Sequence, residues 1–339
     1  MRGIVFLGDS KLDVATFPDP TPGPGEVVLE IKASGMCGSD LHFYRSSLTP
    51  EQASVIRGHE PCGIVVAVGP GVTDPNAVVG ARVMQHHYQG CSGCSDCHSG
   101  WPQMCSTQRP VVYGTDVHGA HAPYMVVPAN TLVPLDERLS FEAGAAISCG
   151  TGTAWGAFDR MELSGRDTLA VFGQGPVGLS ALLLAKAQGA RVLAIDIDDS
   201  RLAVAKQMGA DFVVNSRDGN AVEAIKDLTG GGATKALETS GAKAAGDDAL
   251  RCVRPWGTVG LVGLGSDLTF SLSELLRRQL KIVPSWTMSI QAQKACADFV
   301  IERGIDLDAT FSDRWSIDQA EEAYANFNKQ SGGKGVFLF

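Results

Sequence analysis

Long apolar runs and blocks of positive charge are both missing from this 339-residue chain. No stretch of about 18 apolar residues occurs, which argues against a membrane-spanning helix. Lysine and arginine together number 28 against 37 for aspartate and glutamate, so the formal net charge is −9. We therefore expect no nucleic-acid partner and no anionic membrane partner. The apolar run at residues 4–7 is too short for a signal peptide, which predicts a cytoplasmic protein.

Internal repeats and low-complexity segments are also absent. Apolar residues make up 44% of the chain and charged residues 19%, which is a globular composition. At about 150 residues per domain, the length predicts two domains. Metal-binding side chains are concentrated in the first half, because seven of the nine cysteines lie between Cys37 and Cys149 and all seven histidines between His42 and His121. In a reducing compartment, this concentration favours metal ligation or catalysis over disulfides.

The first half of the chain has the pattern of a β-rich domain. Short apolar runs at residues 27–31, 63–68 and 124–127 are bounded by clusters of glycine and proline. Such runs predict strands, and the long segments between them predict a barrel or sandwich with long loops.

From about Thr168 the pattern changes to strands that alternate with helices. Candidate strands occupy residues 168–172, 192–195, 212–214, 236–238, 258–262 and 281–283, with helices such as 177–188 and 201–208 between them. This alternation predicts a parallel sheet covered on both faces, and six strands fit the doubly wound dinucleotide-binding fold. In the tail, a capping box at residues 316–319 predicts a helix to about residue 327, and residues 336–339 a final strand.

A Gly-x-Gly-x-x-Gly turn follows the first of these strands. Its glycines are Gly173, Gly175 and Gly178, and Pro176 and Val177 stand between the last two. The first glycine permits a tight turn, the second lets the backbone approach a pyrophosphate, and the third lets the helix pack close to the strand. The helix then presents unpaired N–H groups to the phosphates.

An acidic residue ends the second strand of this domain. Asp196 follows Gly178 by 18 residues, where its carboxylate can accept hydrogen bonds from the adenosine ribose. The same carboxylate would repel a 2′-phosphate, so the sequence predicts NAD rather than NADP. The alternative is that Asp196 only caps the turn that follows it.

Two cysteine patterns suggest metal sites. Cys91, Cys94, Cys97 and Cys105 lie within 15 residues, close enough for four thiolates to surround one tetrahedral zinc ion. An iron–sulfur cluster is the competing interpretation. The second pattern is dispersed along the chain. It consists of three short Gly-containing motifs, which hold Cys37, the pair His59 and Glu60, and Cys149.

Taken together, these motifs resemble the zinc-dependent medium-chain alcohol dehydrogenase family. The resemblance runs from the Pro-Gly-Pro-Gly-Glu turn at residues 22–26 to Gly333-Lys334-Gly335, with every motif in the family's order. It implies a β-rich GroES-like catalytic domain at residues 1–148 and 287–339, and a Rossmann NAD-binding domain at residues 149–286. It also implies a homo-oligomer, with a tetramer favoured over a dimer.

The resemblance implies a role for each candidate residue. Cys37, His59 and Cys149 would bind a catalytic zinc, and Glu60 is the carboxylate that can approach it transiently. Cys91, Cys94, Cys97 and Cys105 would bind a structural zinc, giving two zinc ions per chain. Ser39 matches the hydroxyl that contacts the substrate alcohol, His42 the outer end of its proton relay, and Asp40 the carboxylate that orients the histidine ligand. Thr153 and Val177 match positions beside the nicotinamide, and Arg201 the basic side chain near the adenosine ribose.

The implied activity is hydride transfer between an alcohol, or the matching aldehyde or ketone, and NAD. Zinc would act as a Lewis acid in the cleft between the domains. The alternative is a polyol or sugar dehydrogenase with the same chemistry, although many of those relatives carry glutamate where this chain has Cys149. A zinc-free reductase does not need these ligands, and a scaffold that has lost catalysis would not need Ser39 and His42.

Two further histidines suggest a polar substrate pocket. His87 stands four residues before Cys91, where the family often places an aromatic pocket wall, and His121 lies near another position that faces substrate. Imidazoles there could bind a hydroxyl or carboxylate group of the substrate. The alternative is that one or both turn outward to solvent.

Overall fold

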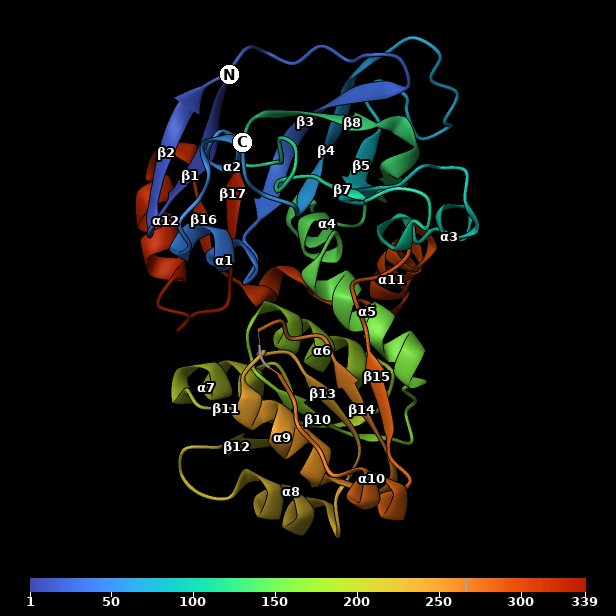
Figure 1. The fold of residues 1–339 in the computed structure, drawn as a ribbon, viewed down its shortest axis with the longest axis vertical. Helices are drawn as coiled ribbons and strands as arrows, with labels where there is room; N and C mark the ends of the chain where they lie inside the picture. Colours follow the sequence, from blue (N-terminus) through green and yellow to red (C-terminus); the bar gives the residue numbers. More distant parts are fainter. Residues whose placement is uncertain (266) are drawn as a thin grey trace. The chain divides into compact units, whose positions relative to one another are not determined.

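The computed structural model describes residues 1–265 and 267–339, which form two compact units (Figure 1). The first unit contains Met1–Gly152, Ser289–Gln330 and Lys334–Phe339, and the second contains Thr153–Met288 and Ser331–Gly333. The functional domains expected from the sequence, which change over at residues 148 and 287, stay a prediction, because compactness alone does not say which residues serve which chemistry. Within the described residues, no helix is both long and apolar enough to cross a membrane.

The first unit is β-rich, as the sequence pattern predicts, and it contains one seven-stranded, mostly antiparallel sheet and two separate two-stranded sheets. Its strands are β1 (Arg2–Gly8), β2 (Lys11–Thr16), β3 (Glu26–Gly35), β4 (Pro61–Val68), β5 (Arg82–Gln85), β6 (Tyr88–Gln89), β7 (Val111–Val112), β8 (Tyr124–Pro128), β9 (Leu132–Pro134), β16 (Phe311–Trp315) and β17 (Lys334–Leu338). Its helices are α1 (Asp40–Arg45), α2 (Pro50–Ala53), α3 (Ser95–His98), α4 (Phe141–Ile147), α11 (Ile290–Arg303) and α12 (Ala320–Phe327).

Strand β3 is the centre of that sheet. The strand order is β16-β17-β3-β4-β5-β9, and β8 also pairs with β3. Alternate side chains of β3, namely Val27, Leu29 and Ile31, are fully buried in an apolar core, as expected when one face of a strand packs inward. Because β17 pairs with β3, the C-terminal strand lies directly beside the segment that leads to Cys37.

The second unit is a doubly wound fold. Helix α5 (Gly150–Met161) leads into it, and its strands are β10 (Thr168–Phe172), β11 (Arg191–Asp196), β12 (Phe212–Asn215), β13 (Ala233–Glu238), β14 (Val253–Leu261) and β15 (Lys281–Pro284). Helices α6 (Pro176–Ala187), α7 (Asp199–Gln207), α8 (Ala221–Thr229), α9 (Lys243–Cys252) and α10 (Leu272–Arg278) connect them. All adjacent strands are parallel in the order β12-β11-β10-β13-β14-β15, which reverses beside β10 as in dinucleotide-binding folds. The predicted α/β fold class is confirmed.

Candidate active site

The three dispersed ligand candidates converge in the first unit. Strands β3 and β4 pair antiparallel, with Ser34 opposite Pro61, so the segment after β3 lies beside the loop before β4. Cys37 and His59 come from these two segments, and Cys149 comes from the turn between α4 and α5. The Sγ atoms of Cys37 and Cys149 are 3.9 Å apart. The ligand atoms of these three residues and of Glu60 all lie within 4.8 Å of one another.

This geometry fits zinc. Zn–S bonds of about 2.3 Å in a tetrahedral site place two sulfurs about 3.8 Å apart. The Cys37 and Cys149 sulfurs match that spacing. Two thiolates and one imidazole are a donor set that zinc accepts, and three protein ligands leave one tetrahedral position for a water or substrate oxygen.

Asp40 fixes the orientation of the His59 ring. The Nδ1–H group of His59 lies 3.1 Å from Asp40 Oδ1, which leaves Nε2 on the side of the thiolates. The backbone N–H of Cys37 donates to Asp40 Oδ2 at 2.9 Å, so one carboxylate holds two of the ligand residues. Although burial favours the protonated acid, the neighbouring His59 imidazole lowers the pKa of Asp40 to about 2.

Ser39 and His42 lie along the start of helix α1. The Ser39 hydroxyl is 3.2 Å from the Cys37 sulfur and 3.3 Å from His59 Nε2, so it borders the position that a metal would take. His42 follows one turn later and is exposed, and its backbone N–H donates to the carbonyl of Ser39. The residue that precedes this short helix therefore brings a hydroxyl to the site, and the helix itself carries an imidazole at the surface.

Glu60 has a buried cationic partner that sequence reasoning missed. Lys334, at the start of β17, forms an ion pair with Glu60, and both side chains are at most 1% exposed. The Lys334 ammonium also donates to the carbonyl of Met36 at 3.2 Å. Burial raises the pKa of Glu60 to about 8, while the ammonium acts in the opposite direction. A lysine between two glycines gave no local sign of burial, because the pairing of β17 with β3 creates it.

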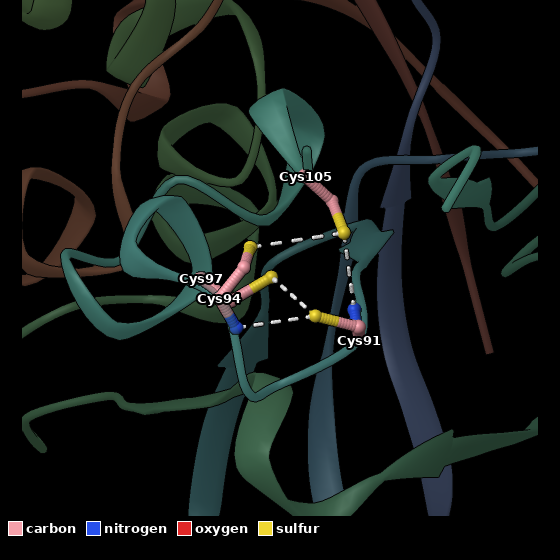
Figure 2. Close-up of side chains that lie close together, drawn as sticks. All are labelled: Cys91, Cys94, Cys97 and Cys105. Atoms are coloured by element: carbon pink, nitrogen blue, oxygen red, sulfur yellow. Dashed lines mark hydrogen bonds between the residues drawn. The ribbon is translucent and has the colours of Figure 1, made fainter. Parts of the chain in front are cut away.

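The four clustered cysteines converge in their own loop (Figure 2). The sulfurs of Cys91 and Cys97, and those of Cys94 and Cys105, are each 3.9 Å apart, which again matches a tetrahedral zinc site. The backbone N–H groups of Cys94 and Cys91 donate to the sulfurs of Cys91 and Cys105 at 3.2 and 3.4 Å. Such donors stabilise thiolates, as a metal site of this type requires.

The two histidines expected in the substrate pocket have different surroundings. Both are buried, so neither turns outward to solvent. The His87 ring lies 5.2 Å from the His59 ring, and its Nδ1 is 3.2 Å from the carbonyl of Ser148. Both ring nitrogens of His121 have protein partners at 2.7 Å, the Ser34 hydroxyl and the Tyr324 hydroxyl, and its expected role toward substrate stays a prediction.

The glycine turn of the second unit has room for a ligand. Gly173 has a φ of +89°, and a Cβ at Gly178 would collide with the Gly173 carbonyl, so both positions require glycine. A Cβ at Gly175 would point into open space, which is where a bound pyrophosphate needs a close backbone approach. Pro176 then begins α6, a position that suits its missing N–H group.

Asp196 lies against this turn. It ends β11 beside β10, and its Oδ2 accepts a hydrogen bond of 2.6 Å from the backbone N–H of Gln174. Its Oδ1 accepts from the backbone N–H of Ile197 at 2.7 Å, so the carboxylate also caps the following turn. The guanidinium of Arg201 is 4.0 Å from the same carboxylate. In the same unit, Thr153 lies on α5 and Val177 on α6.

Comparison with known proteins covers both units. The alcohol dehydrogenase GroES-like domain matches residues 23–137, and the zinc-binding dehydrogenase domain matches residues 176–302. The zinc-type alcohol dehydrogenase-like protein YphC of Escherichia coli is 36% identical, over 100% of this chain and 99% of its own length. The chain belongs to the zinc-dependent medium-chain alcohol dehydrogenase family.

Other members of this alcohol dehydrogenase family show the same likeness. The L-threonine 3-dehydrogenase of Thermococcus kodakarensis is 33% identical, over 94% of this chain and 92% of its own length. The solved structure of alcohol dehydrogenase TADH from Thermus sp. ATN1 superposes with a TM-score of 0.92 at 28% identity, and covers 100% of this chain and 99% of that chain. Membership confirms the predicted enzyme class: the chain is a zinc-dependent oxidoreductase that transfers hydride between an alcohol or carbonyl compound and NAD or NADP.

Proposed function

We propose that Cys37, His59 and Cys149 bind the catalytic zinc of this dehydrogenase, and that the four-cysteine loop binds a second, structural zinc. The observation that carries the first assignment is the spacing of the two thiolates together with the His59–Asp40 hydrogen bond, which leaves Nε2 beside them. When bound there, zinc supplies Lewis-acid polarisation of the alcohol or carbonyl oxygen. Glu60, held by Lys334, is the nearby carboxylate.

The side chains around this position provide the proton path. Ser39 Oγ borders the metal position and is placed to accept the proton of a substrate alcohol. His42, exposed one turn further along α1, is placed to release a proton to solvent. Asp40 acts on the metal only through the orientation of His59.

The second unit supplies the cofactor site in this proposal. Gly173, Gly175, Gly178, Pro176 and the α6 N-terminus would bind the pyrophosphate, and Thr153 and Val177 would lie beside the nicotinamide. Asp196 would accept the ribose hydroxyls with Arg201 nearby, which favours NAD over NADP. The functional domains would then be residues 149–286 for NAD and residues 1–148 with 287–339 for zinc and substrate.

His87 would make the substrate pocket polar. A carbonyl oxygen only accepts, so the contact with Ser148 places the ring proton on Nδ1. Burial lowers the pKa of His87 well below its usual value, so Nε2 is an unprotonated acceptor. The pocket would therefore favour alcohols with a second hydrogen-bond donor, such as a hydroxyl group, over plain alkanols. The presence of an L-threonine 3-dehydrogenase among the relatives supports a polar substrate.

A substrate panel tests this function. We expect NADH formation with alcohols, and a catalytic efficiency about fivefold higher for diols than for alkanols of equal length, since one well-placed hydrogen bond contributes about 1 kcal/mol. His87→Phe should remove that preference while plain alkanols still react. A native enzyme that prefers alkanols and does not respond to His87→Phe would contradict the polar pocket. No NADH formation with any alcohol would contradict the function itself.

The assembly and location belong to the same proposal. Apolar side chains of the second unit, including Leu264, Phe270 and Leu272, are more than half exposed, and they support a homo-oligomer, with a tetramer favoured over a dimer. Two thiolate clusters need reduced cysteines, which supports a cytoplasmic location.

A further inference from the structure

A chain of hydrogen bonds extends behind Asp40, away from the metal ligands. Asp40 Oδ2 accepts from the Tyr324 hydroxyl at 3.3 Å. The Tyr324 hydroxyl is 2.7 Å from His121 Nε2, and His121 Nδ1 is 2.7 Å from the Ser34 hydroxyl. Tyr324 lies on helix α12, His121 in the segment before β8, and Ser34 on strand β3. Hydrogen bonds thus connect separate parts of the first unit to one carboxylate.

The donor and the acceptor of each hydrogen bond in this series follow from Asp40, its last member. Asp40 Oδ2 already accepts from the backbone N–H of Cys37, and Oδ1 faces the Nδ1–H group of His59, so this carboxylate is the acceptor and Tyr324 donates its single proton to it. The Tyr324 oxygen can then only accept at its other contact, which places a proton on His121 Nε2. Burial lowers the pKa of His121 to about 4, so the ring is neutral and its Nδ1 accepts from Ser34. All donors therefore point toward Asp40.

The surroundings make this arrangement rigid and costly to break. Ser34, His121 and Tyr324 are fully buried, and Asp40 is only 4% exposed. The Tyr324 ring packs edge-on against Phe6 with centroids 4.7 Å apart. Water cannot replace a lost partner easily in such a place, so each polar atom depends on its neighbour in the chain.

We propose that Tyr324 and His121 are positioning residues for the catalytic metal, which hold Asp40 in the orientation that presents His59 to zinc. This inference rests on the proposed zinc site of Cys37, His59 and Cys149. Tyr324 contributes the direct hydrogen bond, and His121 fixes the direction in which the Tyr324 hydroxyl points. Helix α12, more than 280 residues further along the chain than Asp40, thereby controls the affinity of the open zinc site.

The test is chelator competition for zinc with Tyr324→Phe. Phenylalanine keeps the ring that packs against Phe6 but removes the hydroxyl. We expect zinc at the open site to bind about tenfold more weakly, the lower end of the range for groups that orient a metal ligand, while the four-cysteine site is unchanged. The matched control is Tyr44→Phe, which also removes a hydroxyl from a buried ring. The Tyr44 ring lies 5.5 Å from the Tyr324 ring but takes no part in this series of hydrogen bonds.

A double variant separates positioning from simple structural support. Tyr324→Phe alone leaves His121 Nε2 without its partner, whereas His121→Phe with Tyr324→Phe removes both polar groups. We expect the double variant to recover thermal stability but not zinc affinity. Recovery of native affinity, or an equal loss in Tyr44→Phe, would overturn the proposal.

A separate variant shows whether the proposed zinc site, rather than the positioning role of Tyr324, is wrong. Cys149→Ser identifies which zinc is released from the open site. If Cys149→Ser and the native protein hold the same zinc with the same affinity, the proposed function is wrong whatever Tyr324→Phe does. If Cys149→Ser loses that zinc and Tyr324→Phe matches Tyr44→Phe, only the positioning role is wrong.

Discussion

We expect the Asp196 carboxylate both to hold the glycine turn and to select the cofactor. Its oxygens accept hydrogen bonds from the backbone of Gln174, in the glycine turn, and of Ile197. These bonds hold the acid against the turn that would bind the cofactor, so its charge is fixed in place before any ligand arrives. A side chain held in this way can both bind a ribose and exclude a phosphate without further rearrangement.

We predict that Asp196→Gly lowers the ratio of catalytic efficiencies for NAD and NADP by about tenfold to a hundredfold, since hydrogen bonds to charged groups contribute about 1.5–3 kcal/mol. Asp196→Asn is the matched control, because it keeps a side-chain oxygen but removes the charge. Its ratio of catalytic efficiencies should lie between those of the native protein and Asp196→Gly. Steady-state kinetics with both cofactors provide the measurement. A native preference for NADP would contradict the assignment and point to Arg201 as a phosphate partner.

Among the elements, the four-cysteine loop is the one that we expect to depend most directly on a bound metal. Between Cys91 and Cys105 it contains only the short helix α3 and a 3-10 turn, Pro102–Met104. Helices this short have little stability of their own, so the sulfur cluster must hold the loop together.

Cys94→Ser should therefore release one zinc and lower the free energy of unfolding by roughly 3 kcal/mol, a large effect of the kind that follows loss of a metal. The open site should keep its zinc. Ser99→Ala, in the same loop but outside the sulfur cluster, is the control and should stay within about 0.5 kcal/mol of the native protein. Denaturant unfolding and zinc analysis measure both. A Cys94→Ser protein with native stability and native zinc content would rule out a structural metal here.

The elements also show what the sequence could and could not predict. The glycine turn and the four cysteines are local patterns, so their geometry follows from spacing alone, and β10 was expected with the bounds that it has. Lys334, Tyr324 and the true partners of His121 could not be expected, because β17, α12 and β3 come together only through tertiary packing. The place of His121 in the sequence predicts a contact with substrate, whereas in the fold its ring nitrogens contact Ser34 and Tyr324.

At the scale of the whole molecule, the candidate metal sites and the candidate cofactor site lie in different compact units. Both sulfur-rich clusters lie in the first unit, and the glycine turn with Asp196 lies in the second. Family membership establishes that the chain is a zinc-dependent oxidoreductase, and we propose that these parts hold its zinc ions and its cofactor. The central claim that remains to be measured is that the two clusters bind two zinc ions with separate roles.

Zinc content and turnover, measured together in the native protein and in Cys149→Ser, test that claim most directly. We expect two zinc ions per native chain. In Cys149→Ser we expect one zinc, a native circular dichroism spectrum and a turnover at least about 10²-fold lower, because the Lewis acid contributes several kcal/mol to the transition state. A native protein with one zinc, or a Cys149→Ser variant that keeps both zinc ions and its turnover, would contradict the account.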